Sequence, residues 1–285
     1  MKQTILSLAM MMTAAMTCQS ADRVEGVHPF PFQGCEILCI QDASMKHPAG
    51  LFADAAKSGY RPGDGAYESS VNVFLLRESG RCCLIDAGLD QTRGAMAGRL
   101  RQAGVAFDSI SDVFITHIHP DHVGGLLLDS KPIFPKATLH IAREEYEAWE
   151  KDAARRALAK YLTPYASRLH LFEFGKELPF GLAPEKRGGH TPGHTIFRKP
   201  LGGGKEAIFV GDIVHAVALQ FPHPTFCARY DAVPSEAVES RIRTLRMAGI
   251  FFGAHFPFPG AAQGGIVQKP NPDWAFKWQP FSAGE

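Results

Sequence analysis

The stretch that decides the fold is Thr116-His117-Ile118-His119-Pro120-Asp121-His122, which places three imidazoles and one carboxylate within six positions. In an extended chain, His117 and His119 project to the same side, so both imidazoles can reach one ion. Pro120 then redirects the backbone, which allows Asp121 and His122 to face a second ion beside the first. The stretch therefore predicts a metal site that follows a strand.

Three later segments carry the same signal. An HxH pair alone is weak evidence, because isolated histidines usually lie at surfaces or as hydrogen-bonded core groups. Here His190 follows two glycines in the turn Gly-Gly-His-Thr-Pro-Gly-His at 188–194, Asp212 ends the apolar run 209–211, and His255 follows Gly253 and Ala254. The agreement of four separate segments favours metal binding over an accident of composition.

The apolar patterning predicts short strands that deliver the chain into these segments. Each candidate ligand falls just after a strand, where loops hold functional groups on a rigid scaffold. Two groups of strands with helices attached indicate two packed sheets covered by helices. We expect strands at 36–41, 71–77, 81–86, 112–116, 137–142, 170–174, 195–199, 207–210 and 250–253, and helices at 90–103, 143–151, 152–161 and 234–249.

The order THIHPDH, GHTPGH, VGD and AH, from about residue 71 to 255, resembles the metallo-β-lactamase superfamily. The resemblance implies an α/β protein with a four-layer αβ/βα sandwich and a binuclear site at the edge of its two sheets. It places His117, His119 and His190 on one metal, Asp121, His122 and His255 on the other, and Asp212 between them. It also implies an outer-shell position for His194, and for Asp86 a role in supporting a ligand from behind.

Imidazole and carboxylate ligands suit two Zn²⁺ ions, with Fe, Mn or Co as substitutes. Two ions about 4 Å apart can share a water, lower its pKa toward ~7 and present hydroxide as a nucleophile. We expect Asp121 to have an additional catalytic role, in which it orients that hydroxide or accepts its proton. The sequence thus predicts a hydrolase.

The segments 211–221 and 254–260 resemble a narrower branch, the methyl parathion hydrolase-like enzymes, which includes organophosphate hydrolases and N-acyl homoserine lactonases. Trp149 matches an aromatic position that lines the pocket in that branch, although it can equally pack its own helix against Tyr146. Phe221 and Phe256, together with Phe226 and Phe258, form either an aromatic rim or part of the core. The expected substrate is a small lactone, carboxylic ester or phosphotriester. Residues 43–66 carry little family signal.

Other functions are possible on the same ligand set. Relatives that hold a di-iron centre and reduce oxygen or nitric oxide usually have acidic ligands in place of a histidine and an attached flavin domain, and this chain has neither. Thiolesterases of the glyoxalase II type need a cationic glutathione site that we do not find. Well-known zinc β-lactamases carry cysteine at the position of Asp212. A metal-binding protein without catalysis is disfavoured because all seven ligand positions are filled.

Composition limits the partners. The 285 residues are 45% hydrophobic, enough for one large domain, which we place at 21–285. Thirty basic and 29 acidic residues give a net charge of +1, so we expect no nucleic-acid partner. A homodimer is compatible with this composition.

The first 20 residues predict a signal peptide: Lys2 precedes an apolar run that is too short to span a bilayer. We therefore expect a periplasmic or secreted protein without a transmembrane segment. A lipid anchor at Cys18 is disfavoured, because Ala15, Met16 and Thr17 match the small-residue pattern poorly. The remaining cysteines are too few and too irregularly spaced for a disulfide scaffold or a structural zinc site.

Overall fold

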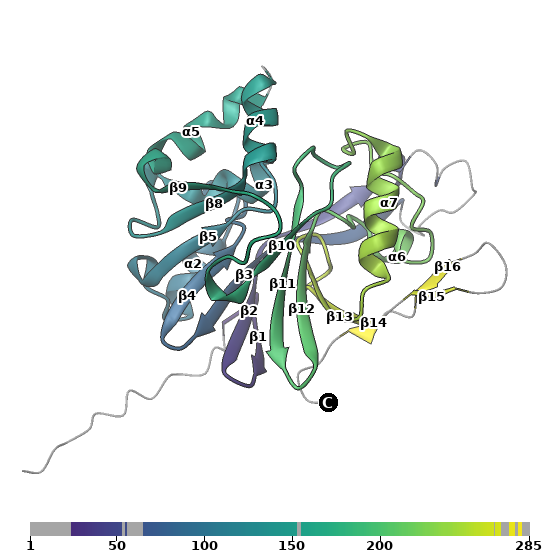
Figure 1. Cartoon of the computed structure of the whole chain (residues 1–285), viewed down its shortest axis with the longest axis horizontal. Helices are drawn as coiled ribbons and strands as arrows, with labels where there is room; N and C mark the ends of the chain where they lie inside the picture. The colour runs from purple at the N-terminus through teal and green to yellow at the C-terminus, as the bar shows by residue number, and fades with distance from the viewer. Residues whose placement is uncertain are drawn as a thin grey trace, which may run out of the picture.

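Two β-sheets packed face to face form the centre of the computed structural model, and helices cover both outer faces (Figure 1). The structure describes residues 24–52, 55, 65–152, 155–264, 266–268, 274–276 and 279–280. The expected leader at 1–20, including Cys18, lies outside the described residues. The layers form the αβ/βα sandwich that the sequence predicted.

In the described part of the chain, the first sheet has seven strands in the order β1-β2-β3-β4-β5-β8-β9. They are β1 (Val27–Phe32), β2 (Cys35–Pro48), β3 (Ala66–Glu78), β4 (Arg81–Ile85), β5 (Ile110–Phe114), β8 (Thr138–Ala142) and β9 (Leu169–Phe172). The first four pair antiparallel, whereas β4, β5, β8 and β9 run parallel. These parallel strands end at one edge of the sheet.

The second sheet has the order β10-β11-β12-β13-β14-β17 among the described residues. Its strands are β10 (Ala183–Lys186), β11 (Thr195–Gly202), β12 (Lys205–Gly211), β13 (Gly249–Gly253), β14 (Ala261–Gly264) and β17 (Gln279–Pro280). Only the β12–β13 pair in this sheet is parallel, and its crossover carries α6 (Val217–Gln220) and α7 (Pro234–Leu245). Two short hairpins complete the described strands: β6 (Leu127–Leu128) with β7 (Lys131–Pro132), and β15 (Ile266–Gln268) with β16 (Trp274–Phe276).

Strand β3 shows how alternating side chains build the layers. Val73 and Leu75 pack toward the helices, while Phe74 and Leu76 pack between the sheets. The Phe74 ring centroid lies 5.6 Å from that of Phe209 on β12, so the two sheets meet through aromatic side chains. Successive side chains of a strand point to opposite faces, which is why one apolar run can serve two cores.

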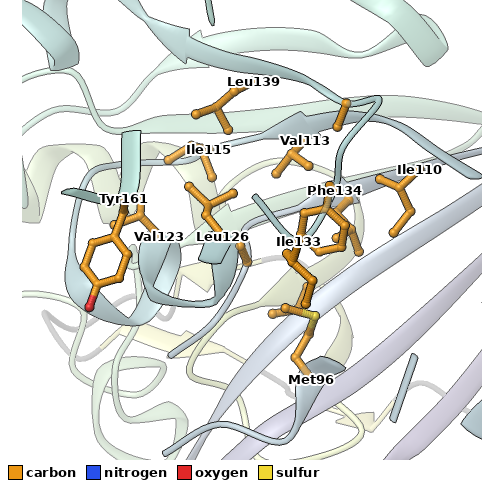
Figure 2. Close-up of a cluster of buried hydrophobic side chains, with 14 of the residues drawn as sticks. Met96, Ile110, Val113, Ile115, Val123, Leu126, Ile133, Phe134, Leu139 and Tyr161 are labelled. Atoms are coloured by element: carbon orange, nitrogen blue, oxygen red, sulfur yellow. The ribbon is translucent and has the colours of Figure 1, made fainter. Parts of the chain in front are cut away.

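Helices α2 (Met96–Gln102), α3 (Pro120–Val123), α4 (Arg143–Lys151) and α5 (Ala159–Leu162) belong to the half of the chain that builds the first sheet (Figure 1). Figure 2 shows the cluster beneath them, where Met96 and Tyr161 gather with Val113, Ile115 and Leu139 of the sheet. On the other side, α6 and α7 pack against the second sheet. No helix among the described residues is both long enough and apolar enough to cross a membrane.

Several elements differ in extent from the predicted ones. Strand β2 continues well beyond residue 41, and strand β3 begins well before residue 71. The two strands pair as far as Pro48 and Ala66 in a long hairpin. Helix α2 starts at Met96 and not at Asp90, because Asp90 accepts the Thr92 amide in a turn while the buried carboxylate of Asp42 accepts the Met96 amide. The stretch 152–161 contains a short 3₁₀ turn (Arg155–Leu158) before α5.

The cysteines in the described residues are unpaired. Cys35 and Cys39 share the buried face of β2 between the sheets, because a spacing of four residues places two side chains on the same face of a strand. Cys82, Cys83 and Cys227 are also free thiols. In the part of the chain that the structure describes, the cysteines therefore form no cross-link.

Candidate metal centre

The seven predicted ligands converge at the edge where the parallel strands of both sheets end. His117 comes three residues after β5, Asp212 directly after β12 and His255 two residues after β13. His190 lies in the turn between β10 and β11, and the short helix α3 supplies Asp121 and His122. Pro120 occupies the first turn of α3, where its missing amide hydrogen costs nothing.

The first donor group consists of His117, His119 and His190, with Asp212 beside them. His119 Nδ1 lies 2.9 Å from His117 Nε2 and 3.0 Å from His190 Nε2. Asp212 Oδ2 lies 3.2 Å from His190 Nε2 and 3.7 Å from His117 Nε2. Three ring nitrogens and one carboxylate oxygen thus surround one point.

The second donor group consists of Asp121, His122 and His255. Asp121 Oδ2 lies 3.4 Å from His255 Nε2 and 3.9 Å from His122 Nε2. Asp212 contacts this group as well: its Oδ1 is 3.0 Å from His122 Nε2 and its Oδ2 is 3.2 Å from His255 Nε2. Because Asp212 contacts both groups, the geometry fits a bridging carboxylate.

The inner nitrogens face one another because partners occupy the outer ones. Asp86 Oδ2 lies 2.8 Å from His122 Nδ1, the Thr116 hydroxyl lies 3.1 Å from His117 Nδ1, and the Ser70 carbonyl lies 2.9 Å from His255 Nδ1. A carboxylate or carbonyl can only accept, so the Nδ1 atoms of His122 and His255 carry the hydrogen. Their Nε2 lone pairs then point inward.

This donor set fits metal ions. Nitrogens of several imidazoles converge on the carboxylates of Asp121 and Asp212. His122 Nε2 and Asp212 Oδ1 are buried without a hydrogen-bond partner. Unsatisfied buried polar atoms are costly unless an ion or water completes them. Two divalent cations held by the two donor groups would satisfy these atoms.

Burial and neighbouring charges shift the pKa values within the cluster, downward for some groups and upward for others. Burial raises the pKa of Asp212, but the imidazoles of His255, His122 and His117 together hold it well below its usual range. Burial, followed by the neighbouring His190, lowers the pKa of His119 to about 3. The pKa of His190 shifts in the opposite direction to that of His119. Burial lowers it, but hydrogen bonds with Asp212 and Asp231 outweigh burial and raise it to about 9.

Close backbone packing around the ligands explains the glycines of the motifs. Gly189 has φ +110°, and a Cβ there would lie 2.1 Å from the Ala237 amide nitrogen of α7. Gly211 has φ +51°, and a Cβ there would lie 2.7 Å from His194 Nε2. That nitrogen accepts the Asp212 amide hydrogen at 3.0 Å, so His194 holds the bridging residue through its backbone.

A cavity of about 290 Å³ opens above the two donor groups. Met45, His47, Pro120 and Tyr230 form its wall beside the ligands. Met45 and His47 come from the extended β2 strand, in the segment whose sequence carried little family signal.

The three aromatic residues predicted to line the pocket lie elsewhere. Phe221 and Phe256 are 1% exposed and pack edge to face at 5.5 Å in the core beneath α7. Trp149 packs against the first sheet and lines a different cavity, of about 440 Å³, between α4 and α5. None of the three contributes to the wall of the cavity above the donor groups.

Two further residues at the site, His215 and Glu145, have little or no signal in the sequence. His215 is fully buried, its Nε2 lies 3.3 Å from Asp212 Oδ2, and neither of its ring nitrogens has a hydrogen-bond partner. It follows the VGD motif by three residues, which was the only signal available. Glu145 of α4 accepts the amides of Ile118 and Gly193 at 2.9 Å each, and so joins the two ligand loops. Nothing in the local sequence marks Glu145.

The chain matches the model of a known protein family. The model described as metallo-beta-lactamase superfamily matches residues 66–250, more than half of the chain. A curated relative, the anti-Pycsar protein Apyc1 of Paenibacillus harenae, is 47% identical over 55 residues. That match covers 19% of this chain and 21% of the relative, so it spans about a fifth of the relative's length.

Solved structures resemble most of the chain. One is described as hydrolase AbOPH in the beta lactamase superfamily, with a TM-score of 0.79 and 24% identity over 90% of this chain and 98% of that one. Another is AidC, described as a dizinc quorum-quenching lactonase in complex with a product, with a TM-score of 0.78 and 22% identity over 91% and 99%. At these identities the likeness is one of fold.

Proposed function

Because the chain belongs to the metallo-β-lactamase superfamily, we propose that it is a binuclear metal-dependent hydrolase that cleaves an uncharged lactone, carboxylic ester or phosphotriester. The observation that carries the proposal is the contact of one carboxylate, Asp212, with both donor groups. Two bound ions would supply a hydroxide nucleophile near neutral pH and polarise the substrate oxygen.

Zinc is the proposed metal, since the donors are imidazole nitrogens and carboxylate oxygens. Iron, manganese and cobalt remain alternatives with the same donors. Asp121 is the partly exposed acid of the cluster, with 24% of its side chain accessible, and it lines the cavity. We assign Asp121 to hold the attacking water in position and to accept its proton.

The proposed substrate class follows from the cavity wall. Met45, Pro120 and Tyr230 offer apolar contact, and no lysine or arginine among the described residues lines the cavity. An anionic substrate would gain from a basic side chain there, so an uncharged ester, lactone or phosphotriester fits better. The dizinc lactonase among the structures of the same fold supports the lactone within this class.

Export is part of the proposal. The first 20 residues have the pattern of a cleaved leader, which would release the enzyme into the periplasm or the medium. Mass spectrometry of the N-terminus of protein recovered from the periplasm tests this directly. Recovery of the full-length chain in the cytoplasm alone would overturn it.

The test of the function combines metal analysis with three substrates. We expect about two zinc ions per chain and chelator-reversible cleavage of an aryl ester, an acyl homoserine lactone or an aryl phosphotriester. His170→Gln is the matched control, because it removes an imidazole on the edge strand β9 and leaves the donor groups intact. Tightly held iron with oxygen consumption and no hydrolysis would replace this proposal with a di-iron redox enzyme.

A further inference from the structure

Within the first donor group, His190 alone has a described carboxylate behind its outer nitrogen. Its Nδ1 lies 3.1 Å from Oδ1 of Asp231, a residue 41 positions later whose side chain is completely buried. Within the first donor group, the outer nitrogen of His117 meets only a neutral hydroxyl, that of Thr116. The Nδ1 of His119 faces the other two imidazoles of this group, and His119 is the most exposed of the three.

Asp231 is itself held by a buried cation. Its Oδ2 accepts a hydrogen bond from the Ala228 amide at 3.2 Å and lies 3.3 Å from Nη2 of Arg241 on α7. Arg241 is 1% exposed. A carboxylate buried without such a partner would be strongly destabilised or would become neutral. With Arg241 beside it, Asp231 can stay ionised next to His190.

Arg241 also holds the loop that carries Asp231. Its Nε donates to the Ile213 carbonyl at 2.7 Å, and its Nη1 donates to the carbonyls of Pro224 and Phe226 at 2.9 and 3.0 Å. These contacts span the segment between Asp212 and α7. Helix α7 therefore fixes the position of this segment relative to the donor groups.

From this chain of contacts we propose that Asp231, held by Arg241, is a positioning residue that fixes His190 as an Nε2 ligand of the first ion. The proposal rests on the proposed metal-binding function. Asp231 accepts the Nδ1 hydrogen of His190, which leaves the Nε2 lone pair directed at the first donor group and makes it a stronger donor. The second ion has its own equivalent in Asp86 behind His122.

The prediction is a site-selective loss of metal affinity. Asp231→Asn keeps the size of the side chain and removes its charge. It should lower the affinity for the first ion by roughly 10- to 100-fold. The affinity for the second ion should change by less than about threefold. Asp86→Asn is the matched control, because Asp86 lies behind His122 and its substitution should lower the affinity for the second ion. Competition with a chelator and the absorption spectrum of the cobalt-substituted protein distinguish the two sites.

A second set of variants separates positioning from folding. Asp231→Asn leaves Arg241 as an unpaired buried charge, so the double variant Asp231→Asn/Arg241→Met removes both charges together. It should show the same selective metal loss. Arg241→Lys keeps a cation beside Asp231 and should retain the first ion within about threefold, with a lower thermal midpoint of the metal-free protein because the fork of hydrogen bonds is lost.

The outcomes separate the two proposals. If the wild-type protein does not bind two ions, the proposed function is wrong. If the wild type binds two ions and Asp231→Asn and the double variant do so with unchanged affinity, Asp231 has no positioning role and only this inference fails. A fall in metal-free stability with both ions weakened equally would also overturn it, because that pattern indicates a purely structural ion pair.

Discussion

Two cavities of this protein differ in a way that shows how a site is recognised. The cavity between α4 and α5 is larger, about 440 Å³ against about 290 Å³ above the donor groups. Trp149 and Leu162 are among the residues that line it. The smaller cavity is lined by four residues of the two donor groups and by the bridging Asp212. Converging donors, and not volume, identify the reactive cavity.

The largest difference between the two cavities should appear when the bridging ligand, Asp212, is substituted. Asp212→Ala removes a carboxylate that contacts both donor groups, so both ions and hydrolysis should be lost together. His119→Ala should also abolish the two-ion stoichiometry, because it removes one of the three nitrogens around the first ion. Metal content and turnover are measured on the same preparations. Full activity in either variant would contradict the binuclear centre.

Truncation in the larger cavity should affect stability and leave chemistry unchanged. Trp149→Ala removes a side chain that is 4% exposed, which should lower the free energy of unfolding by about 3–5 kcal/mol. Two ions and an unchanged KM should remain in the protein that stays folded. Leu162→Ala is the control in the same cavity. If Trp149→Ala raises KM and Leu162→Ala does not, Trp149 contacts the substrate after all.

The wall of the smaller cavity should affect binding more than turnover. Tyr230 lines this cavity, is 54% exposed and has its ring centroid 5.9 Å from that of His215. Tyr230→Ala removes an aromatic contact worth about 1.4 kcal/mol, so KM should rise roughly tenfold with kcat little changed. Tyr230→Phe keeps the ring and should bind nearly as the wild type. Equal losses of kcat in both variants would instead indicate a reaction step that needs the hydroxyl.

The two cavities also show what the sequence could predict. The residues of the donor groups could be predicted because they follow strands within short motifs. Their meeting at the edge of the two sheets came from the resemblance to the superfamily. The walls could not be predicted. His47 and Met45 reach the cavity only because β2 extends past residue 41, and Asp231 meets His190 only after the loop before α7 folds back. Such contacts depend on tertiary packing that linear spacing does not encode.

The smallest difference should be in acid sensitivity, because His47 lines the metal cavity and no histidine among the described residues lines the larger one. Burial, followed by repulsion from His255 and His215, lowers the pKa of His47 to about 3. An unfolded imidazole has a pKa of about 6.5, so between these values the unfolded chain binds a proton that the folded chain excludes. The contribution of His47 to the free energy of unfolding is therefore fully present above about pH 6.5 and is lost as the pH drops toward 3.

We expect the metal-free protein to melt at a lower temperature at pH 5 than at pH 7.5, and His47→Leu to show a smaller decrease. The decrease should persist in part, because burial beside His190 lowers the pKa of His119 to about 3 as well. Thermal melts of both proteins at the two pH values, with chelator present, provide the measurement. An identical pH dependence would mean that His47 takes up its proton without unfolding, and that the cavity wall is open enough to hydrate an imidazolium.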